Sequence, residues 1–175
     1  MSTTMCTLLP DLVVTSMKAV SAFASQLPGL SSVDAVGLCE VVRARWPQVT
    51  FDGARFGAFV AERLVDGGDV KQLHVADLYL VWAALDGQAP ALRSFDALLV
   101  EWTTAALRAR PAGVELPEVQ SVLRERLLVG ERPALRGFGG QGALMAYVIV
   151  AALRALTDAV RRTASAQHLG ALELA

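Results

Sequence analysis

Residues 76–102 read ADLYLVWAALDGQAPALRSFDALLVEW, and this stretch decides the fold class. Apolar residues recur at helical spacing on both sides of a polar break at residues 86–90, which carries a glycine and a proline. We therefore predict a helix over about residues 73–85 and a second helix after the break. The apolar stripe of the second helix consists of Leu92, Phe95, Leu98, Leu99, Trp102 and Ala106. Because the connection is short, the two helices should pack as an antiparallel hairpin over residues 73–108.

A pair of shorter helices is predicted before this hairpin. Ser31 and Ser32 are suitable N-caps for a helix over residues 33–45. Asp52 is a suitable N-cap for the next helix, in which apolar residues again recur at helical spacing. The residues of that second stripe are Phe56, Phe59, Val60 and Leu64. Residues 31–66 therefore form a helical pair that is added to the hairpin.

Two further helices are predicted after the hairpin. An amphipathic helix follows the proline-bounded break at residues 111–117 and ends near residue 129. Its inward residues are Val119, Val122 or Leu123, and Leu127, and its outward residues include Glu118, Arg124 and Glu125. The last helix covers about residues 143–163. Because no segment alternates as a strand does, the predicted fold class is all-α, with four helices in the main unit.

The chain divides into four predicted segments. Residues 1–30 form a partly flexible N-terminal segment, and residues 31–70 hold the helical pair. The glycines at positions 67 and 68 mark the boundary before the main helical domain, which covers residues 71–165. Residues 166–175 form a tail.

Composition describes a globular protein and gives little indication of a partner. Of the 175 residues, 54% are hydrophobic, which is enough to build a core, and the formal net charge is −1. Cys6 and Cys39 lie far apart without metal-ligand spacing, which fits a reducing compartment. The eleven apolar residues at positions 143–153 are fewer than the roughly 18–20 that span a bilayer. We therefore expect a soluble cytoplasmic protein without membrane contact.

Enzymatic signatures are weak. The glycine-rich segment at residues 137–142 lacks the Lys-Ser/Thr that a phosphate loop needs, and no strand precedes it. Only His74 and His168 could serve a histidine-based triad, and no nucleophile motif accompanies either of them. We expect neither an enzyme nor a bound cofactor or metal.

The order of these pieces resembles region 2 of the sigma-70 family of RNA polymerase sigma factors. ADLYLVWAALDGQAPALRSFDALLVEW is followed by PEVQSVLRERLLVGERPALRGFGGQGALMAYVIVAALRALTDAVRR. This succession is similar to an extracytoplasmic-function branch found in gliding soil bacteria. The resemblance covers about residues 40–163 and rests on the order and spacing of several motifs. It implies a sigma region 2-like helical bundle with an N-terminal helical extension.

The resemblance implies two binding surfaces. In sigma factors, the helix that matches residues 117–129 docks on the clamp helices of the largest polymerase subunit. Here the corresponding polar outward face consists of Glu118, Gln120, Arg124 and Glu125. Promoter −10 DNA is expected at Arg136, Gln141, Tyr147, Arg154, Arg161 and Arg162. An anti-sigma protein is a further partner of the kind that the family uses.

Several positions depart from the family pattern. Gln141, Met145 and Ile149 stand where the family has arginines, and Tyr147 stands for a tryptophan. Because each phosphate contact adds to a salt-dependent affinity, these losses should weaken DNA binding. The remaining arginines can also be read as solvated helix and loop ends. Tyr147 and Phe138 can likewise be read as packing residues.

Two functions remain open from the sequence. The first is a single-region sigma-like initiation factor that binds core polymerase and, weakly, promoter DNA, since no helix-turn-helix region follows residue 163. The second is a degenerate sigma homologue that binds protein and does not melt DNA.

Overall fold

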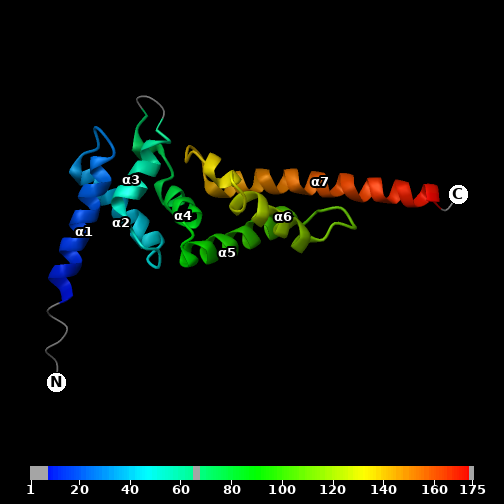
Figure 1. Ribbon diagram of the computed structural model, residues 1–175, viewed down its shortest axis with the longest axis horizontal. Coiled ribbons are helices and arrows are strands. Elements are labelled where there is room, and N and C mark those ends of the chain that lie inside the picture. The colour runs from blue at the N-terminus through cyan, green and yellow to red at the C-terminus, as the bar shows by residue number, and fades with distance from the viewer. Residues whose placement is uncertain (1–7, 65–67, 174–175) are drawn as a thin grey trace, which may run out of the picture.

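The computed structural model describes residues 8–64 and 68–173, and every regular element in these two ranges is helical (Figure 1). The α-helices are α1 (Leu8–Ser25), α2 (Ser32–Arg45), α3 (Gly53–Ala61), α4 (Val75–Leu85), α5 (Ala89–Ala106), α6 (Leu116–Leu128) and α7 (Leu144–Glu173). The short 3₁₀ helices are η1 (Val70–Gln72) and η2 (Ala134–Gly137). The predicted all-α fold class is therefore confirmed for the described ranges. Cys6 and the side chain of His168 lie outside the described part of the chain.

The predicted N-caps of α2 and α3 are confirmed. The hydroxyl oxygen of Ser31 accepts a hydrogen bond from the backbone N–H of Asp34 at 3.1 Å. The carboxylate of Asp52 accepts one from the backbone N–H of Arg55, also at 3.1 Å. Each cap satisfies a backbone donor that has no partner inside its helix, so the two helices begin where the sequence indicates.

Helix α1 was not predicted. Pro10 interrupts the apolar run at the N-terminus, but it lies in the first turn of α1, where proline is tolerated. The helix packs closely on α3, because a Cβ atom at Gly53 would overlap the backbone carbonyl of Ala19. Phe23 of α1 is completely buried in the contact. The N-terminal extension is therefore a three-helix unit.

A cluster of aromatic rings joins this unit to α4. The rings of Phe23 and Phe56 stack at 5.5 Å, and Phe56 meets Tyr79 edge-on at 5.1 Å. Tyr79 in turn stacks on Trp82 at 5.6 Å. Its hydroxyl donates a hydrogen bond to the backbone carbonyl of Val49, so the buried phenol is satisfied. The core is thus continuous across the expected boundary near residue 70.

Helices α5, α6 and α7 pack together beside α4, with which α5 also makes contact (Figure 1). The residues of α6 that face this core are Val119, Leu123 and Leu127, as predicted, while Val122 is half-buried. On α5, Phe95 and Leu99 of the predicted stripe are fully buried, whereas Ala106 is exposed. Helix α7 continues past the predicted end near residue 163, and its far end extends beyond the other helices.

Candidate functional site

The glycine-rich loop before α7 is held in place by long-range hydrogen bonds. The backbone N–H of His74 donates to the carbonyl of Gly140 at 2.8 Å. The carboxylate of Asp77 accepts from the N–H of Leu144 at 2.9 Å and so caps the N-terminus of α7. Gly140 has a φ of +77°, and a Cβ atom there would collide with the side chain of Leu78. Glycine is therefore required at position 140.

Arg63, which follows α3, binds the same loop from the other side. Its Nε donates to the carbonyl of Phe138 and its Nη2 donates to the carbonyl of Arg136, both at 3.0 Å. Its Nη1 donates to the carbonyl of Phe59 at 2.8 Å, and its guanidinium carbon lies 3.3 Å from the centre of the Phe59 ring. Burial lowers the pKa of the Arg63 guanidinium, although the nearby Glu62 carboxylate opposes this shift.

A groove of about 620 Å³ lies between α6, the loop and α7. Leu123 and Leu127 line it from α6, Phe138 lines it from the loop, and Tyr147 and Val150 line it from α7. Its walls are mainly apolar, and its volume falls in the range of sites that hold small molecules or side chains.

The structure brings together three of the six residues expected to bind DNA. Gln141, Tyr147 and Arg154 all line the groove. Arg136 does not, because η2 directs it to a separate depression of about 320 Å³ that it shares with residues of α3 and α4. Arg161 and Arg162 lie further along α7, outside the groove lining. The six residues expected to bind DNA therefore do not all line this groove.

Phe138 is a packing residue, whereas Tyr147 both packs on the loop and lines the groove. Phe138 is 3% exposed and belongs to the core. The ring of Tyr147 meets Phe138 edge-on at 5.5 Å, and its hydroxyl donates to the carbonyl of Ala134 at 2.6 Å. Tyr147 is half-buried: it supports the loop and also lines the groove.

Two arginines line the groove, and they differ in their partners. Arg126 of α6 pairs with Asp158 of α7 at 2.9 Å, so much of its charge is neutralised. Arg154 is exposed, and within the described ranges no acceptor lies within bonding distance of its guanidinium. Arg154 is therefore the side chain best placed to attract an anion into this groove.

Hydrophobic side chains are exposed along α7, Val150 in the groove lining and Met145 and Leu153 outside it. Met145 is 46% exposed, and Val150 and Leu153 are each 48% exposed. Ile149 is half-buried, so it neither points fully into solvent nor belongs to the core. At the two positions of α7 where the resemblance leads us to expect arginines, Met145 and Ile149, the side chains are thus hydrophobic.

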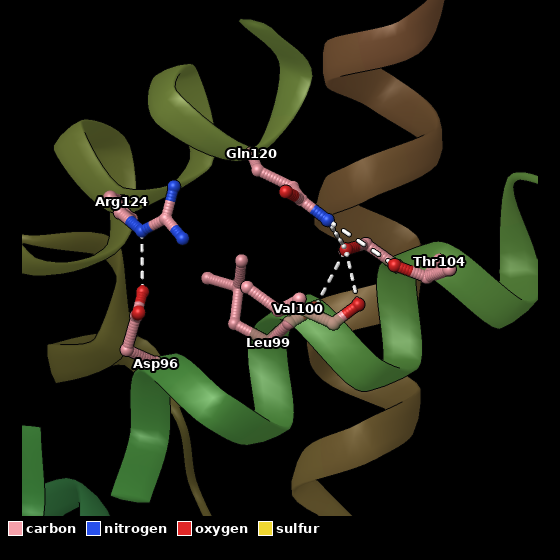
Figure 2. Close-up of polar contacts among 7 residues, drawn as sticks. Asp96, Leu99, Val100, Thr104, Gln120 and Arg124 are labelled. Atoms are coloured by element: carbon pink, nitrogen blue, oxygen red, sulfur yellow. Dashed lines mark hydrogen bonds and ion pairs between the residues drawn. The ribbon is translucent and has the colours of Figure 1, made fainter. Parts of the chain in front are cut away.

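The predicted polymerase-binding face of α6 needs one correction. Gln120 is only 7% exposed and points toward α5 (Figure 2). Its Nε2 donates to the hydroxyl oxygen of Thr103 on α5 at 2.9 Å. Gln120 lies three and seven residues before the buried Leu123 and Leu127, so it falls on the inward face of α6, and the hydrogen bond satisfies its amide there. Arg124 is half-exposed and pairs with Asp96 of α5 (Figure 2).

Glu118 and Glu125 remain on the exposed face of α6. The carboxylate of Glu118 lies 3.9 Å from the guanidinium of Arg162 on α7, and both side chains are more than half exposed. Such an exposed pair contributes little to stability, so Glu118 is available to a partner, as is the exposed Glu125.

Sequence reasoning missed Arg63 and Asp77, although both position the loop. Arg63 binds Phe138, which lies 75 residues further along the chain, and Asp77 binds Leu144, which lies 67 residues further. Helical periodicity reports only neighbours within a few turns, so it could not identify these contacts. The proximity of Asp77 to the start of α4 fits an ordinary first-turn acid equally well.

Comparison of the chain with protein-family models, with curated proteins and with solved structures gives no match. Within residues 8–64 and 68–173, no helix has both the length and the apolar character needed to cross a membrane.

Proposed function

We propose that this chain is a sigma-70 region 2-like transcription initiation factor. It binds core RNA polymerase through α6 and, weakly, a single strand of promoter −10 DNA through the groove. The observation that supports this proposal is that one helix, α6, both lines the groove and exposes acidic side chains. Leu123 and Leu127 on one side of the helix line the groove, while Glu118 and Glu125 are exposed on its surface. A factor with this role works in the bacterial cytoplasm, where core polymerase is found.

The chemistry of the groove suits an unpaired nucleotide strand. Its apolar walls and the half-buried ring of Tyr147 offer packing surface to a base. Stacking of this kind tolerates any base. Arg154 offers a charge to one phosphate. Because Arg126 is already paired with Asp158, the strand meets few cations, and its affinity should be low and moderately dependent on salt.

Polymerase binding is tested by reversing the exposed acids of α6. We expect Glu118→Lys combined with Glu125→Lys to reduce co-purification with core polymerase at least tenfold, while helical content stays unchanged, because exposed charges contribute little to folding. Arg124 is left intact, since it ties α6 to Asp96 of α5. Glu101→Lys, at an exposed position of α5, is the matched control and should bind normally. Equal binding by the double variant would remove polymerase docking by α6 from the proposal.

A second candidate function is favoured by the exposed hydrophobic side chains of α7. Met145, Val150 and Leu153 are exposed, and Met145 stands where the resemblance expects an arginine. A surface of this kind suits contact with a protein better than contact with phosphate. In this case the chain is a sigma-like regulator that binds polymerase or another protein and does not melt the promoter.

Restoring cations at the start of α7 separates the two candidates. Gln141 and Met145 are both exposed and stand where the resemblance expects arginines. If a strand lies along the groove, Gln141→Arg with Met145→Arg should tighten binding to a −10-like single strand. The slope of log affinity against log salt should also steepen by about 1.4, which is about 0.7 for each new phosphate contact. A folded double variant that still binds no single strand would favour the protein-binding regulator.

A further inference from the structure

Arg63 makes an unusual set of contacts for a residue outside the groove. Its side chain is 11% exposed, and all three nitrogens of its guanidinium donate to backbone carbonyls. Two of these carbonyls belong to Arg136 and Phe138 in the segment that forms the groove wall. The third belongs to Phe59 of α3, so the guanidinium links the N-terminal three-helix unit to the loop.

The groove wall, the segment from Ala134 to Phe138, is held from the groove side by Tyr147. Tyr147 donates to the carbonyl of Ala134 at 2.6 Å and meets Phe138 edge-on. Arg63 thus binds the outer side of the same short segment that Tyr147 binds from within the groove. A displacement of the segment would move Phe138, which lines the groove, and would remove the support of the Tyr147 ring.

We propose that Arg63 is a positioning residue of the groove, through which the N-terminal unit of α1, α2 and α3 sets the position of the groove wall and the affinity for its ligand. This inference rests on the proposed function for the identity of that ligand, but the placement of the wall by Arg63 does not. Arg63 itself does not line the groove, so its charge makes no direct contact there.

Lysine cannot reproduce this arrangement. A guanidinium is planar and presents donors in several fixed directions, whereas an ammonium is a compact group on a flexible stem. One lysine could reach one or two of the three carbonyls, and the others would lose their partner. Since Phe138 is 3% exposed, a carbonyl left there would be poorly hydrated.

Amide hydrogen exchange tests the placement of the wall without any ligand. In Arg63→Met, the amides of Phe138 and His74, which donate to Leu135 and Gly140, should exchange at least tenfold faster. Amides of the α1–α3 contact should keep their rates. The matched control is Arg55→Met, because Arg55 lies on α3 and pairs with Asp86 without touching the loop. Unchanged exchange at Phe138 and His74 in Arg63→Met would overturn the inference.

Binding of a −10-like single-stranded oligonucleotide tests the effect on affinity. We expect Arg63→Met to weaken binding about tenfold with an unchanged salt slope, because no phosphate contact is lost. Arg63→Lys should give an intermediate exchange rate and affinity, and it replaces Arg63→Met if that variant does not fold. A changed slope, or a loosened wall with unchanged affinity, would contradict a positioning role. If the wild-type chain binds no oligonucleotide, the proposed DNA function fails, and the exchange rates still decide whether Arg63 places the wall.

Discussion

The aromatic core around α4 and the glycine-rich groove wall are built in opposite ways. In the core, Phe23, Phe56, Tyr79 and Trp82 pack ring against ring and are nearly or completely buried. In the wall, backbone groups are bound by side chains from distant helices, with Arg63 as the main one. The free energy gained by burying the rings is non-directional and grows with the buried apolar area, whereas the directional hydrogen bonds fix the position of the wall. The aromatic core therefore stabilises the fold, whereas the groove wall shapes the site.

The largest effect should follow removal of a ring from the core. Phe56 is 1% exposed and contacts Phe23, Tyr79 and Trp82. We expect Phe56→Ala to lower the free energy of unfolding by about 4 kcal/mol, because transfer and cavity terms add. Urea denaturation followed by circular dichroism measures this change. A loss below about 1 kcal/mol would mean that the rings do not form the stabilising core.

A polar contact inside the α5–α6 interface should have an intermediate effect. Gln120→Ala removes the donor to Thr103, whose own hydroxyl still donates to the carbonyl of Leu99 at 2.7 Å. We expect the free energy of unfolding to fall by about 2 kcal/mol, from the lost hydrogen bond and the lost packing. The exposed Ser121→Ala is the control and should change it by less than about 0.5 kcal/mol. If Gln120→Ala is neutral, Gln120 faces solvent as the sequence analysis predicted.

The pH dependence of stability tests the burial of Cys39, which belongs to the same core cluster as the aromatic rings. Burial raises the pKa of Cys39 to about 11, and the positive charge of Arg43 opposes this only in part. The unfolded thiol loses its proton at lower pH than the folded one, so this contribution to stability is complete below about pH 9 and is lost as the pH rises toward 11. Between pH 8 and pH 10, the wild-type chain should lose about 1.4 kcal/mol more than Cys39→Ala. Equal losses in the two proteins would show that the thiol is not desolvated.

The smallest effect should come from the cap at the start of α7. Asp77→Ala removes the acceptor for the N–H of Leu144, and we expect the free energy of unfolding to fall by about 1 kcal/mol. Asp77→Asn keeps an oxygen acceptor and should recover most of this loss. Exchange of the Leu144 amide should accelerate in the alanine variant only. If both variants behave alike, Asp77 acts through its charge and not as a cap.

The sequence was sufficient for the elements whose information is local. Helical spacing and the caps at Ser31 and Asp52 predicted α2 and the start of α3, because both depend on neighbours within a turn or two, but α3 ends at Ala61, before Leu64 of its predicted stripe. Helix α1 was missed because residues 1–30 were interpreted as one partly flexible segment, although Pro10 occupies the first turn, where proline is tolerated. In each case the deciding interaction, whether correctly or wrongly interpreted, lies within the helix itself.

The site was less predictable because its contacts are not local. Gln120 was assigned to the outward face, but it lies three and seven residues before Leu123 and Leu127 and therefore on the buried face of α6, where Thr103 of α5 accepts its hydrogen bond. Gln141, Tyr147 and Arg154 were placed together by the resemblance, and they do line one groove. Arg136 was assigned to the same surface, but η2 turns it away. A pattern along the chain cannot report which way a short loop turns between two helices.

The salt dependence of single-strand binding tests the central claim, that the groove between α6 and α7 receives DNA. Affinity for a −10-like single-stranded oligonucleotide is measured at several salt concentrations for the wild-type chain and for Arg154→Gln. The control is Arg93→Gln, at an exposed position outside the groove lining. We predict that the wild-type chain binds, and that Arg154→Gln binds more weakly with a slope smaller by about 0.7, while Arg93→Gln matches the wild type. No binding by the wild-type chain, or equal slopes for Arg154→Gln and the wild type, would contradict a DNA-binding groove.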